Sequence, residues 1–260
     1  REFPLHEILR SNPILQHLRS IKEPEEIELL QKACNITEKG VRRLLSFVKP
    51  GVWEYEIEAE LMHEFLRNRS KGFAYTPIIA SGENANVLHY IANNMQCKDG
   101  DVILLDVGAE YANYSSDLTR MIPVNGKFTA RQKEIYNAVL DMKNFATSLL
   151  VPGNNWYDYH KECGEFYTSK FLELGLLDKA DVQNQDKNWP AYKKYMMHGT
   201  SHHLGLDTHD YGILKDKFVE NMVFTVEPGI YLPAEGFGVR IEDDMVIQNS
   251  GPAFNLMKNI

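Results

Sequence analysis

Apolar side chains recur at helical spacing over residues 24–48, which predicts a long amphipathic helix. Pro24 and the acidic residues that follow it suit the first turn of this helix, and Pro50-Gly51 ends it. The same spacing returns over residues 54–68 and predicts a second helix. Two further helices are expected at about residues 130–150 and 157–174.

Shorter apolar runs bounded by turn residues predict strands. They lie at residues 77–80, 102–105, 114–120, 222–226 and 238–246. Asp106 follows the second run and Glu227 follows the fourth, and a charge at the end of a buried strand is costly unless it is paired or binds a metal. In the last run charged and apolar residues alternate, which places Arg240, Glu242 and Asp244 on one face. A half-exposed surface strand with a salt bridge would show the same alternation.

Asp117 lies eleven positions after Asp106, in the next strand-like run. Either residue alone would more often belong to a turn or a helix cap. Two such residues that flank a predicted hairpin inside the core are harder to explain in this way.

The order of elements occurs twice. Pro50-Gly51 and Pro152-Gly153 each lie between two predicted helices, and each helix pair precedes strands that carry two acidic residues. Recurrence of Pro-Gly at helix ends by chance is the alternative. Duplication predicts one domain, residues 24–260, built from similar halves at about 24–123 and 129–247, with a site between them. Residues 1–23 are expected to be a linker from a further N-terminal domain.

Four of the nine histidines lie in one short stretch, residues 196–211: His198, His202, His203 and His209. Imidazole titrates near neutral pH and is the commonest metal ligand. The residues around these histidines are largely apolar, and polar groups in an apolar surrounding need partners. The stretch therefore indicates a metal site or an acid–base site, although a solvated polar loop would also fit a single His pair. Residues 174–195, just before it, are polar and are expected to be a surface insertion without chemistry.

The charge and the cysteines narrow the class of protein. The chain has 28 Lys and Arg against 36 Asp and Glu, a net charge of −8, and no basic run, so nucleic acid is not an expected partner. No apolar run approaches the roughly 18–20 residues that span a bilayer, so no membrane is expected either. The three cysteines form no close motif, which suits reduced thiols in a cytoplasmic protein.

Taken together, these features resemble the pita-bread-fold metallopeptidases, the family of methionine aminopeptidase, prolidase and aminopeptidase P. Five separated strings match in the family's order: Leu105-Asp106-Val107-Gly108-Ala109-Glu110, Ser116-Asp117-Leu118-Thr119-Arg120, Ser201-His202-His203-Leu204-Gly205-Leu206-Asp207-Thr208-His209-Asp210, Val226-Glu227-Pro228-Gly229-Ile230-Tyr231 and Val239-Arg240-Ile241-Glu242-Asp243. The resemblance implies an α+β fold in which two pseudo-symmetric helix-helix-strand halves surround a curved antiparallel sheet, with the helices outside.

The resemblance also implies a dinuclear metal site. Its five ligands would be Asp106, Asp117, His202, Glu227 and Glu242, with Asp117 and Glu242 bridging the two ions. Four carboxylates and one imidazole exceed the tetrahedral set that is usual for one zinc ion, which agrees with two ions. Oxygen-rich ligation favours Mn(II), with Co, Fe or Zn as alternatives.

Further residues match positions that act on substrate in the family. We expect catalytic roles for His89, His198, His209 and Glu227, and substrate binding by His89, His209, Tyr231 and Arg240. The histidines would stabilise the developing oxyanion, Glu227 would relay a proton, and Arg240 would hold acidic ligands in place. His198 could instead be a satisfied core histidine, and His203 is expected to be structural. Tyr90, like Tyr231, is a candidate to pack against a proline ring.

The histidine string favours one subtype of the family. Ser201 before His202, and the run from Leu206 to Asp210, resemble aminopeptidase P, whereas prolidases usually carry Gly before this His. The expected function is removal of an N-terminal residue from peptides with proline second, with Xaa-Pro dipeptidase as the alternative. A non-catalytic peptide-binding module of this fold is disfavoured because the chain keeps all five ligands. The expected partner is a peptide, and the resemblance allows a homodimer.

Overall fold

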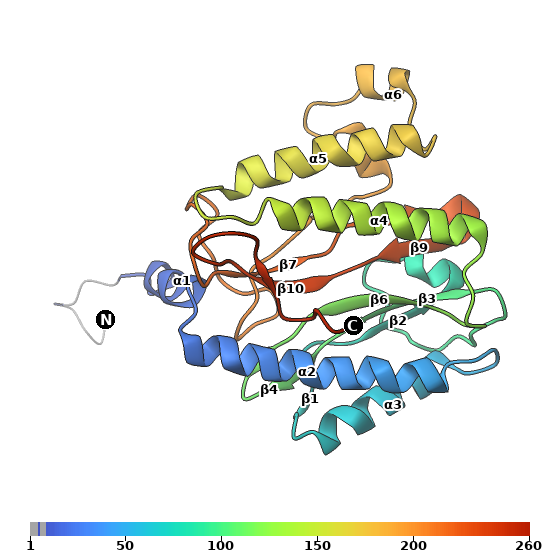
Figure 1. Ribbon diagram of the computed structural model, residues 1–260, viewed down its shortest axis with the longest axis horizontal. Helices are drawn as coiled ribbons and strands as arrows, with labels where there is room; N and C mark the ends of the chain where they lie inside the picture. The colour runs from blue at the N-terminus through green and yellow to red at the C-terminus, as the bar shows by residue number, and fades with distance from the viewer. Residues whose placement is uncertain (1–4, 6–8) are drawn as a thin grey trace.

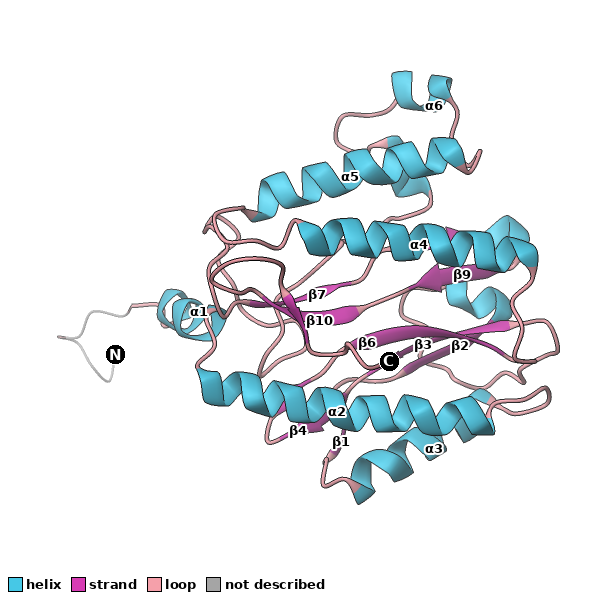
Figure 2. Ribbon diagram, viewed as in Figure 1, coloured by secondary structure: helices cyan, strands magenta, loops and turns pink. Residues whose placement is uncertain are grey.

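Two pairs of helices form the outer layers of the molecule, and antiparallel strands lie between them (Figure 1, Figure 2). The computed structural model describes residue 5 and residues 9–260. The first pair is α2 (Pro24–Phe47) and α3 (Glu54–Arg67), and the second is α4 (Ala130–Ser148) and α5 (Trp156–Glu173). The four predicted helices are therefore confirmed, to within a few residues at their ends.

Local chemistry explains where these helices begin. Pro24 occupies the first turn of α2, and the Glu26 carboxylate accepts a hydrogen bond from the backbone N–H of Glu23 at 2.8 Å. Thr129 caps α4 by accepting a hydrogen bond from the N–H of Gln132 at 3.2 Å. Such side chains satisfy backbone groups that the helix itself leaves free, so the starts of α2 and α4 could be predicted from the sequence.

The first half of the chain contributes a three-stranded antiparallel sheet in the order β2 (Ile78–Ser81), β3 (Val102–Val107), β6 (Leu118–Pro123). Between β3 and β6 the chain forms a hairpin of β4 (Ala109–Tyr111) and β5 (Tyr114–Ser115), and β1 (Gly72–Phe73) pairs with β4. Asp106 lies in β3 and Asp117 directly precedes β6. The predicted hairpin that carries these two acids is therefore present.

The second half is built differently from the prediction at one point. β7 (Val223–Val226) pairs with β10 (Asp243–Val246), which pairs with β11 (Phe254–Asn255), while β8 (Gly229–Leu232) pairs with β9 (Phe237–Arg240). A single strand over residues 238–246 is therefore wrong, because the chain changes sheets after Arg240. At the change Glu242 forms an isolated bridge with Thr119, whose carbonyl accepts the Glu242 N–H at 3.1 Å. This bridge joins the two halves.

Two apolar cores lie on opposite sides of β3. Leu104 packs in the core that includes residues of α4 and α5, whereas Ile103 and Leu105 pack in the core that includes residues of α2 and α3. Successive side chains of a strand point to opposite faces, so a strand covered on both sides must be apolar throughout. The result is an α+β arrangement with strands inside and helices outside, as predicted.

Three outer segments complete the chain. A helix, α1 (Asn12–Ser20), was not predicted, and its side chains Ile14 and Leu18 are exposed. The predicted linker, residues 1–23, lies partly outside the described residues, which exclude 1–4 and 6–8. Residues 174–195 form the short α6 (Lys179–Gln183) and a 3-10 turn, η2 (Ala191–Lys194), and most are at least partly exposed. None of the described helices has the length and apolar character needed to cross a membrane.

Candidate metal centre and active site

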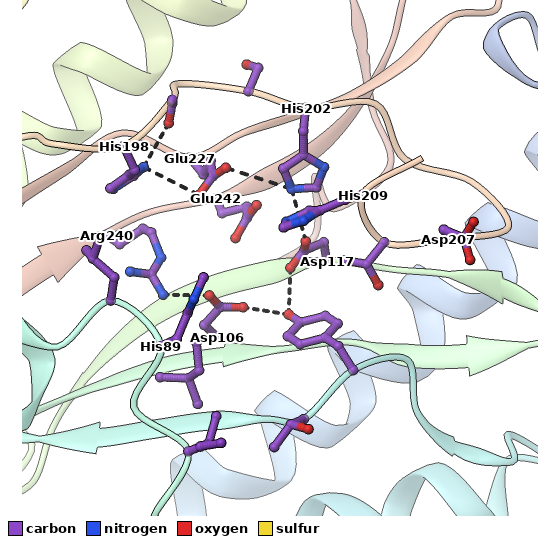
Figure 3. A pocket seen from close by; sticks show the side chains of 18 residues that line it. His89, Asp106, Asp117, His198, His202, Asp207, His209, Glu227, Arg240 and Glu242 are labelled. Atoms are coloured by element: carbon purple, nitrogen blue, oxygen red, sulfur yellow. Dashed lines mark hydrogen bonds and ion pairs between the residues drawn. The ribbon is translucent and has the colours of Figure 1, made fainter. Parts of the chain in front are cut away.

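A cavity of about 710 Å³ is lined by residues from both halves of the chain (Figure 3). Nine of the ten predicted site residues line it: His89, Asp106, Asp117, His198, His202, His209, Glu227, Arg240 and Glu242. The tenth, Tyr231, is 1% exposed and lies behind His198. The nine predicted site residues in the cavity span 153 positions of the sequence, from His89 to Glu242.

Asp106 and Asp117 reach the cavity from the two sides of the first-half hairpin. The strands approach closely because Gly108 has no side chain, and a Cβ there would lie 1.8 Å from the Ser116 carbonyl oxygen. The Tyr75 hydroxyl lies 2.6 Å from Oδ1 of Asp106 and 2.5 Å from Oδ1 of Asp117. Since one hydroxyl carries one proton, it donates to only one of these carboxylates at a time. Burial and the two acids raise the pKa of Tyr75 well above its ordinary value, so the hydroxyl stays protonated.

His202 and Glu227 are held beside β7 by backbone hydrogen bonds. The Thr225 N–H donates to the His202 carbonyl at 2.9 Å, and the Glu227 N–H donates to the Thr200 carbonyl at 2.8 Å. Glu242 reaches the same point from the break between β9 and β10. The second half therefore supplies three of the five predicted ligands from fixed backbone positions.

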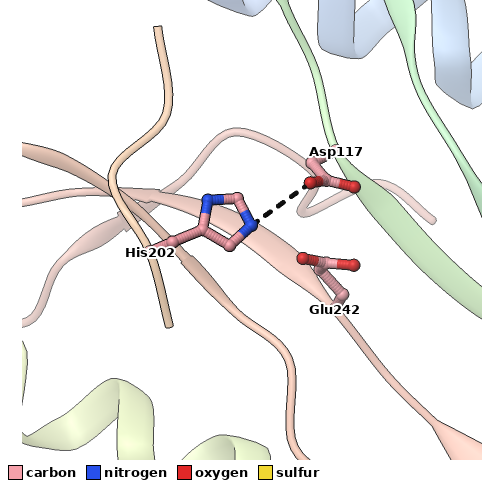
Figure 4. Close-up of side chains that lie close together, drawn as sticks. All are labelled: Asp117, His202 and Glu242. Carbon is pink, nitrogen blue, oxygen red and sulfur yellow. Dashed lines mark ion pairs between the residues drawn. The ribbon is translucent and has the colours of Figure 1, made fainter. Parts of the chain in front are cut away.

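Three of the five predicted ligands meet closely (Figure 4). One ligand atom from each of Asp117, His202 and Glu242 lies within 4.8 Å of the others. The other two flank this group: Glu227 Oε1 is 3.8 Å from His202 Nε2, and Asp106 is joined to Asp117 through the Tyr75 hydroxyl. The arrangement is an extended row rather than one compact set, which suits more than one ion.

The protonation of His202 indicates a place for positive charge. Its Nδ1 donates to the His203 carbonyl at 2.9 Å, so Nε2 faces Asp117 Oδ2 at 3.4 Å and the Glu227 carboxylate. Burial opposes a charge on the ring, but the hydrogen bond to Asp117 and the charge of Glu227 raise the pKa of His202 to about 9. A proton or a metal ion at Nε2 would satisfy both carboxylates.

The carboxylates themselves also fit divalent cations. Burial raises the pKa of Glu227 to about 7 and raises the pKa values of Asp106 and Glu242. Glu242 Oε2 accepts a hydrogen bond from the Thr119 hydroxyl at 2.7 Å, whereas its buried Oε1 has no hydrogen-bond partner among the described residues. Buried carboxylates of this kind are stabilised by cations, and hard divalent ions prefer oxygen ligands. The donor set therefore fits the expected metal centre.

Arg240 links Asp106, one of the predicted metal ligands, to Tyr231. Its Nη2 donates to Asp106 Oδ2 at 2.5 Å and its Nη1 donates to the Tyr231 hydroxyl at 2.8 Å. That hydroxyl donates in turn to His198 Nε2 at 2.7 Å, while His198 Nδ1 donates to the Gly199 carbonyl at 2.8 Å. Burial and the nearby Arg240 lower the pKa of His198 to about 3, so its ring is neutral. Both ring nitrogens are engaged, which makes His198 a link between Tyr231 and the chain rather than a free donor.

His209 lies on a loop that a buried ion pair holds in place. The Lys22 ammonium lies 3.1 Å from Asp210 Oδ2, and both side chains are 1% exposed. A Cβ at Gly205 would lie 2.1 Å from the same oxygen, so only glycine leaves room for the pair. Burial and the neighbouring His202 lower the pKa of His209, which favours a neutral ring at pH 7.

Sequence reasoning missed Tyr75, Lys22 and the true position of Asp244. Asp244 Oδ2 accepts the Asp117 N–H at 3.0 Å and so fixes that residue from behind. These contacts join positions 31 to 188 residues apart, and no local pattern marks them. His203 packs against Phe224 with ring centroids 4.3 Å apart, in agreement with a structural role.

The comparisons with known proteins agree with this site. The sequence model of metallopeptidase family M24 matches residues 28–249, so the chain belongs to this family. It is similar to the Xaa-Pro aminopeptidases of Haemophilus influenzae (42% identity, 94% of this chain, 59% of the relative) and of Escherichia coli (40%, 92% and 56%). The structure of aminopeptidase P from E. coli with the inhibitor Pro-Leu aligns with a TM-score of 0.89 at 37% identity, over 97% of this chain and 60% of that one.

Two conclusions follow from these similarities. The pita-bread fold predicted from the sequence is confirmed, and family membership implies divalent metal ions at the site. The chain spans less than two thirds of the length of the curated relatives it matches.

Proposed function

We propose that the chain is an aminopeptidase that removes the N-terminal residue from peptides with proline in second position. The observation that carries this proposal is one cavity in which a row of buried and half-buried carboxylates and His202 is bordered by two further histidines, His89 and His209. Relatives named Xaa-Pro aminopeptidase, at 40% and 42% identity, support the choice of substrate.

Asp106, Asp117, His202, Glu227 and Glu242 would hold two divalent ions. Their oxygen-rich character favours Mn(II), with Co, Fe or Zn as alternatives. When bound, such ions polarise a carbonyl group and lower the pKa of water so that hydroxide is available near neutral pH.

Residues of the chain itself would transfer the proton and stabilise the charge that develops on the substrate. Glu227, beside His202, would accept the proton of the attacking water and pass it to the leaving nitrogen. His209 and His89 border the cavity and would donate hydrogen bonds to the carbonyl oxygen as negative charge develops on it. Arg240 holds Asp106, and through Tyr231 it orients His198, so both Arg240 and Tyr231 would act on substrate indirectly.

The cavity wall also suits a proline ring. Ile78, Leu88 and Ile91 line it on the side of β2 and of the segment that carries His89. Proline lacks a backbone N–H, so an enzyme that accepts it binds the ring by shape and the carbonyl by side-chain donors. Tyr90, a sequence candidate for the ring contact, donates instead to Glu54 at 2.8 Å.

The alternative is an Xaa-Pro dipeptidase, and a substrate panel separates the two. The metal-loaded protein should cleave Xaa-Pro-Yaa between the first two residues and leave Xaa-Ala-Yaa and N-acetyl-Xaa-Pro-Yaa largely intact. Preference for alanine, or indifference to acetylation, would contradict the proposal. Cleavage of the dipeptide Xaa-Pro alone would move the assignment to dipeptidase. We further propose a cytoplasmic location and a homodimer, to be tested by fractionation and by light scattering.

A further inference from the structure

Glu54, the first residue of α3, is a fully buried carboxylate far in the sequence from the predicted site residues, with 0% of its surface exposed. Its Oε1 accepts hydrogen bonds from the Ser81 N–H and hydroxyl, at 2.8 and 2.7 Å, and from the Asn84 amide at 3.1 Å. Its Oε2 accepts from the Tyr90 hydroxyl at 2.8 Å and from the Met95 N–H at 2.9 Å. All five donors are neutral.

These donors belong to two segments, one that precedes His89 and one that contains it. Ser81 ends β2 and Asn84 lies in the following 3-10 turn, η1 (Gly82–Asn86), whereas Tyr90 and Met95 lie in residues 87–96. Residues 87–96 contain no helix or strand, and besides the backbone hydrogen bond from the Glu54 N–H to the Met95 carbonyl at 3.0 Å, side chains hold this segment against α3. A buried carboxylate that lost these donors would carry a large desolvation cost, which makes the contacts strongly favoured.

A second contact from the same helix reinforces the first. Asn93 donates to Glu58 Oε2 at 2.9 Å and to the Pro77 carbonyl at 3.0 Å, and its own side-chain oxygen accepts the Ile79 N–H at 3.0 Å. Glu54 and Glu58 are one helical turn apart and so lie on the same face of α3. This face of α3 holds the segment at three points, at Tyr90 and Met95 through Glu54 and at Asn93 through Glu58.

His89 is the residue that this arrangement orients. His89 lies in a turn and directly precedes Tyr90, and the Tyr90 hydroxyl bonds to Glu54 while His89 lines the cavity. We propose that Glu54 and Glu58 are positioning residues that hold His89 toward the substrate, Glu54 acting through Tyr90 and Glu58 through Asn93. The catalytic consequence rests on the proposed function, whereas the physical contact does not.

The test uses Tyr90→Phe, which removes one hydrogen bond and keeps the ring. The matched control is Tyr55→Phe. Tyr55 follows Glu54 in α3 and is 52% exposed. Glu54→Gln is the stronger variant, and Tyr90→Phe keeps the test valid if Glu54→Gln does not fold. Two measurements are made on the full, metal-loaded chain: amide hydrogen exchange of residues 87–96, and kcat/KM for an Xaa-Pro peptide in the parent and in a His89→Ala background.

We expect Tyr90→Phe to speed exchange in residues 87–96 selectively and to lower kcat/KM about three- to tenfold, the size of effect that one hydrogen bond supports. In the His89→Ala background the same change should have almost no further effect, because its effect passes through His89. Unchanged exchange in 87–96 would overturn the physical contact, and equal losses in both backgrounds would overturn the link to His89. If the parent cleaves no Xaa-Pro peptide but Tyr90→Phe still speeds exchange in residues 87–96, the proposed function is wrong and the contact between Glu54 and Tyr90 is confirmed.

Discussion

The imidazole rings of His202 and His209 lie 4.4 Å apart, centroid to centroid, with their planes at 70° (Figure 3). The compact group of ligand atoms contains His202, Asp117 and Glu242, and His209 borders the same cavity from a position seven residues further along the connection between η2 and β7. The geometry therefore places His209 beside the predicted metal centre, where it can contact a substrate without holding an ion.

Replacing His209 with alanine should lower kcat strongly while both metal ions stay bound. Loss of one donor to a developing oxyanion costs about 2.7–4 kcal/mol, or about 10²–10³ in kcat. Steady-state kinetics with metal analysis of the same sample checks this, and His63→Ala on the exposed face of α3 is the control. Loss of metal in the His209 variant would make the residue structural instead.

Asp117→Ala and Glu242→Ala should reduce activity by orders of magnitude. Each side chain would serve two ions at once, so its loss would disturb the whole centre. Asp178→Ala and Asp186→Ala, which change exposed carboxylates in the segment after α5, should leave kcat/KM near that of the parent. Full activity in either bridging variant would remove the assignment of that residue.

The purified protein should bind two divalent ions per chain after loading with Mn(II). The reason is the row of carboxylates around His202, which cations would stabilise; burial raises the pKa values of three of them, Asp106, Glu227 and Glu242. Elemental analysis of the folded, loaded protein measures the ratio. Absence of bound metal in that sample would rule out the dinuclear centre.

Acid should destabilise the fold partly through His160, which is not one of the predicted metal ligands. Burial lowers the pKa of His160 to about 4, so the unfolded chain binds a proton more readily between pH 6.5 and 4. Its contribution is complete above pH 6.5 and is lost as the pH falls to 4 and below, about 3 kcal/mol in all at about 1.4 kcal/mol per unit. Urea unfolding of metal-free protein at pH 7.5 and pH 5 should show a smaller drop for His160→Gln than for the parent. A drop equal to that of the parent would contradict the assignment, and His63→Gln is the exposed control.

The helices and the hairpin were predictable because their signals are local. Pro24 and Thr129 mark helix starts through contacts within three residues, and the apolar run of β3 needs no partner to be recognised. The order of Asp106, Asp117, His202, Glu227 and Glu242 was likewise visible as separate strings. The strings did not give the distances between these side chains, because a sequence motif specifies which groups occur and not how far apart their atoms lie.

Local signals specify the helix–helix–strand order and the chemical types of the site residues, since caps, periodicity and donor chemistry are properties of neighbours along the chain. Long-range packing divides residues 238–246 into two strands, because Glu242 bonds to Thr119 rather than continuing the ladder. Long-range contacts also join Asp106 to Asp117 through Tyr75 and hold the segment carrying His89 through Glu54. Those roles depend on burial and on partners from distant strands and loops, which exist only once both halves have packed together.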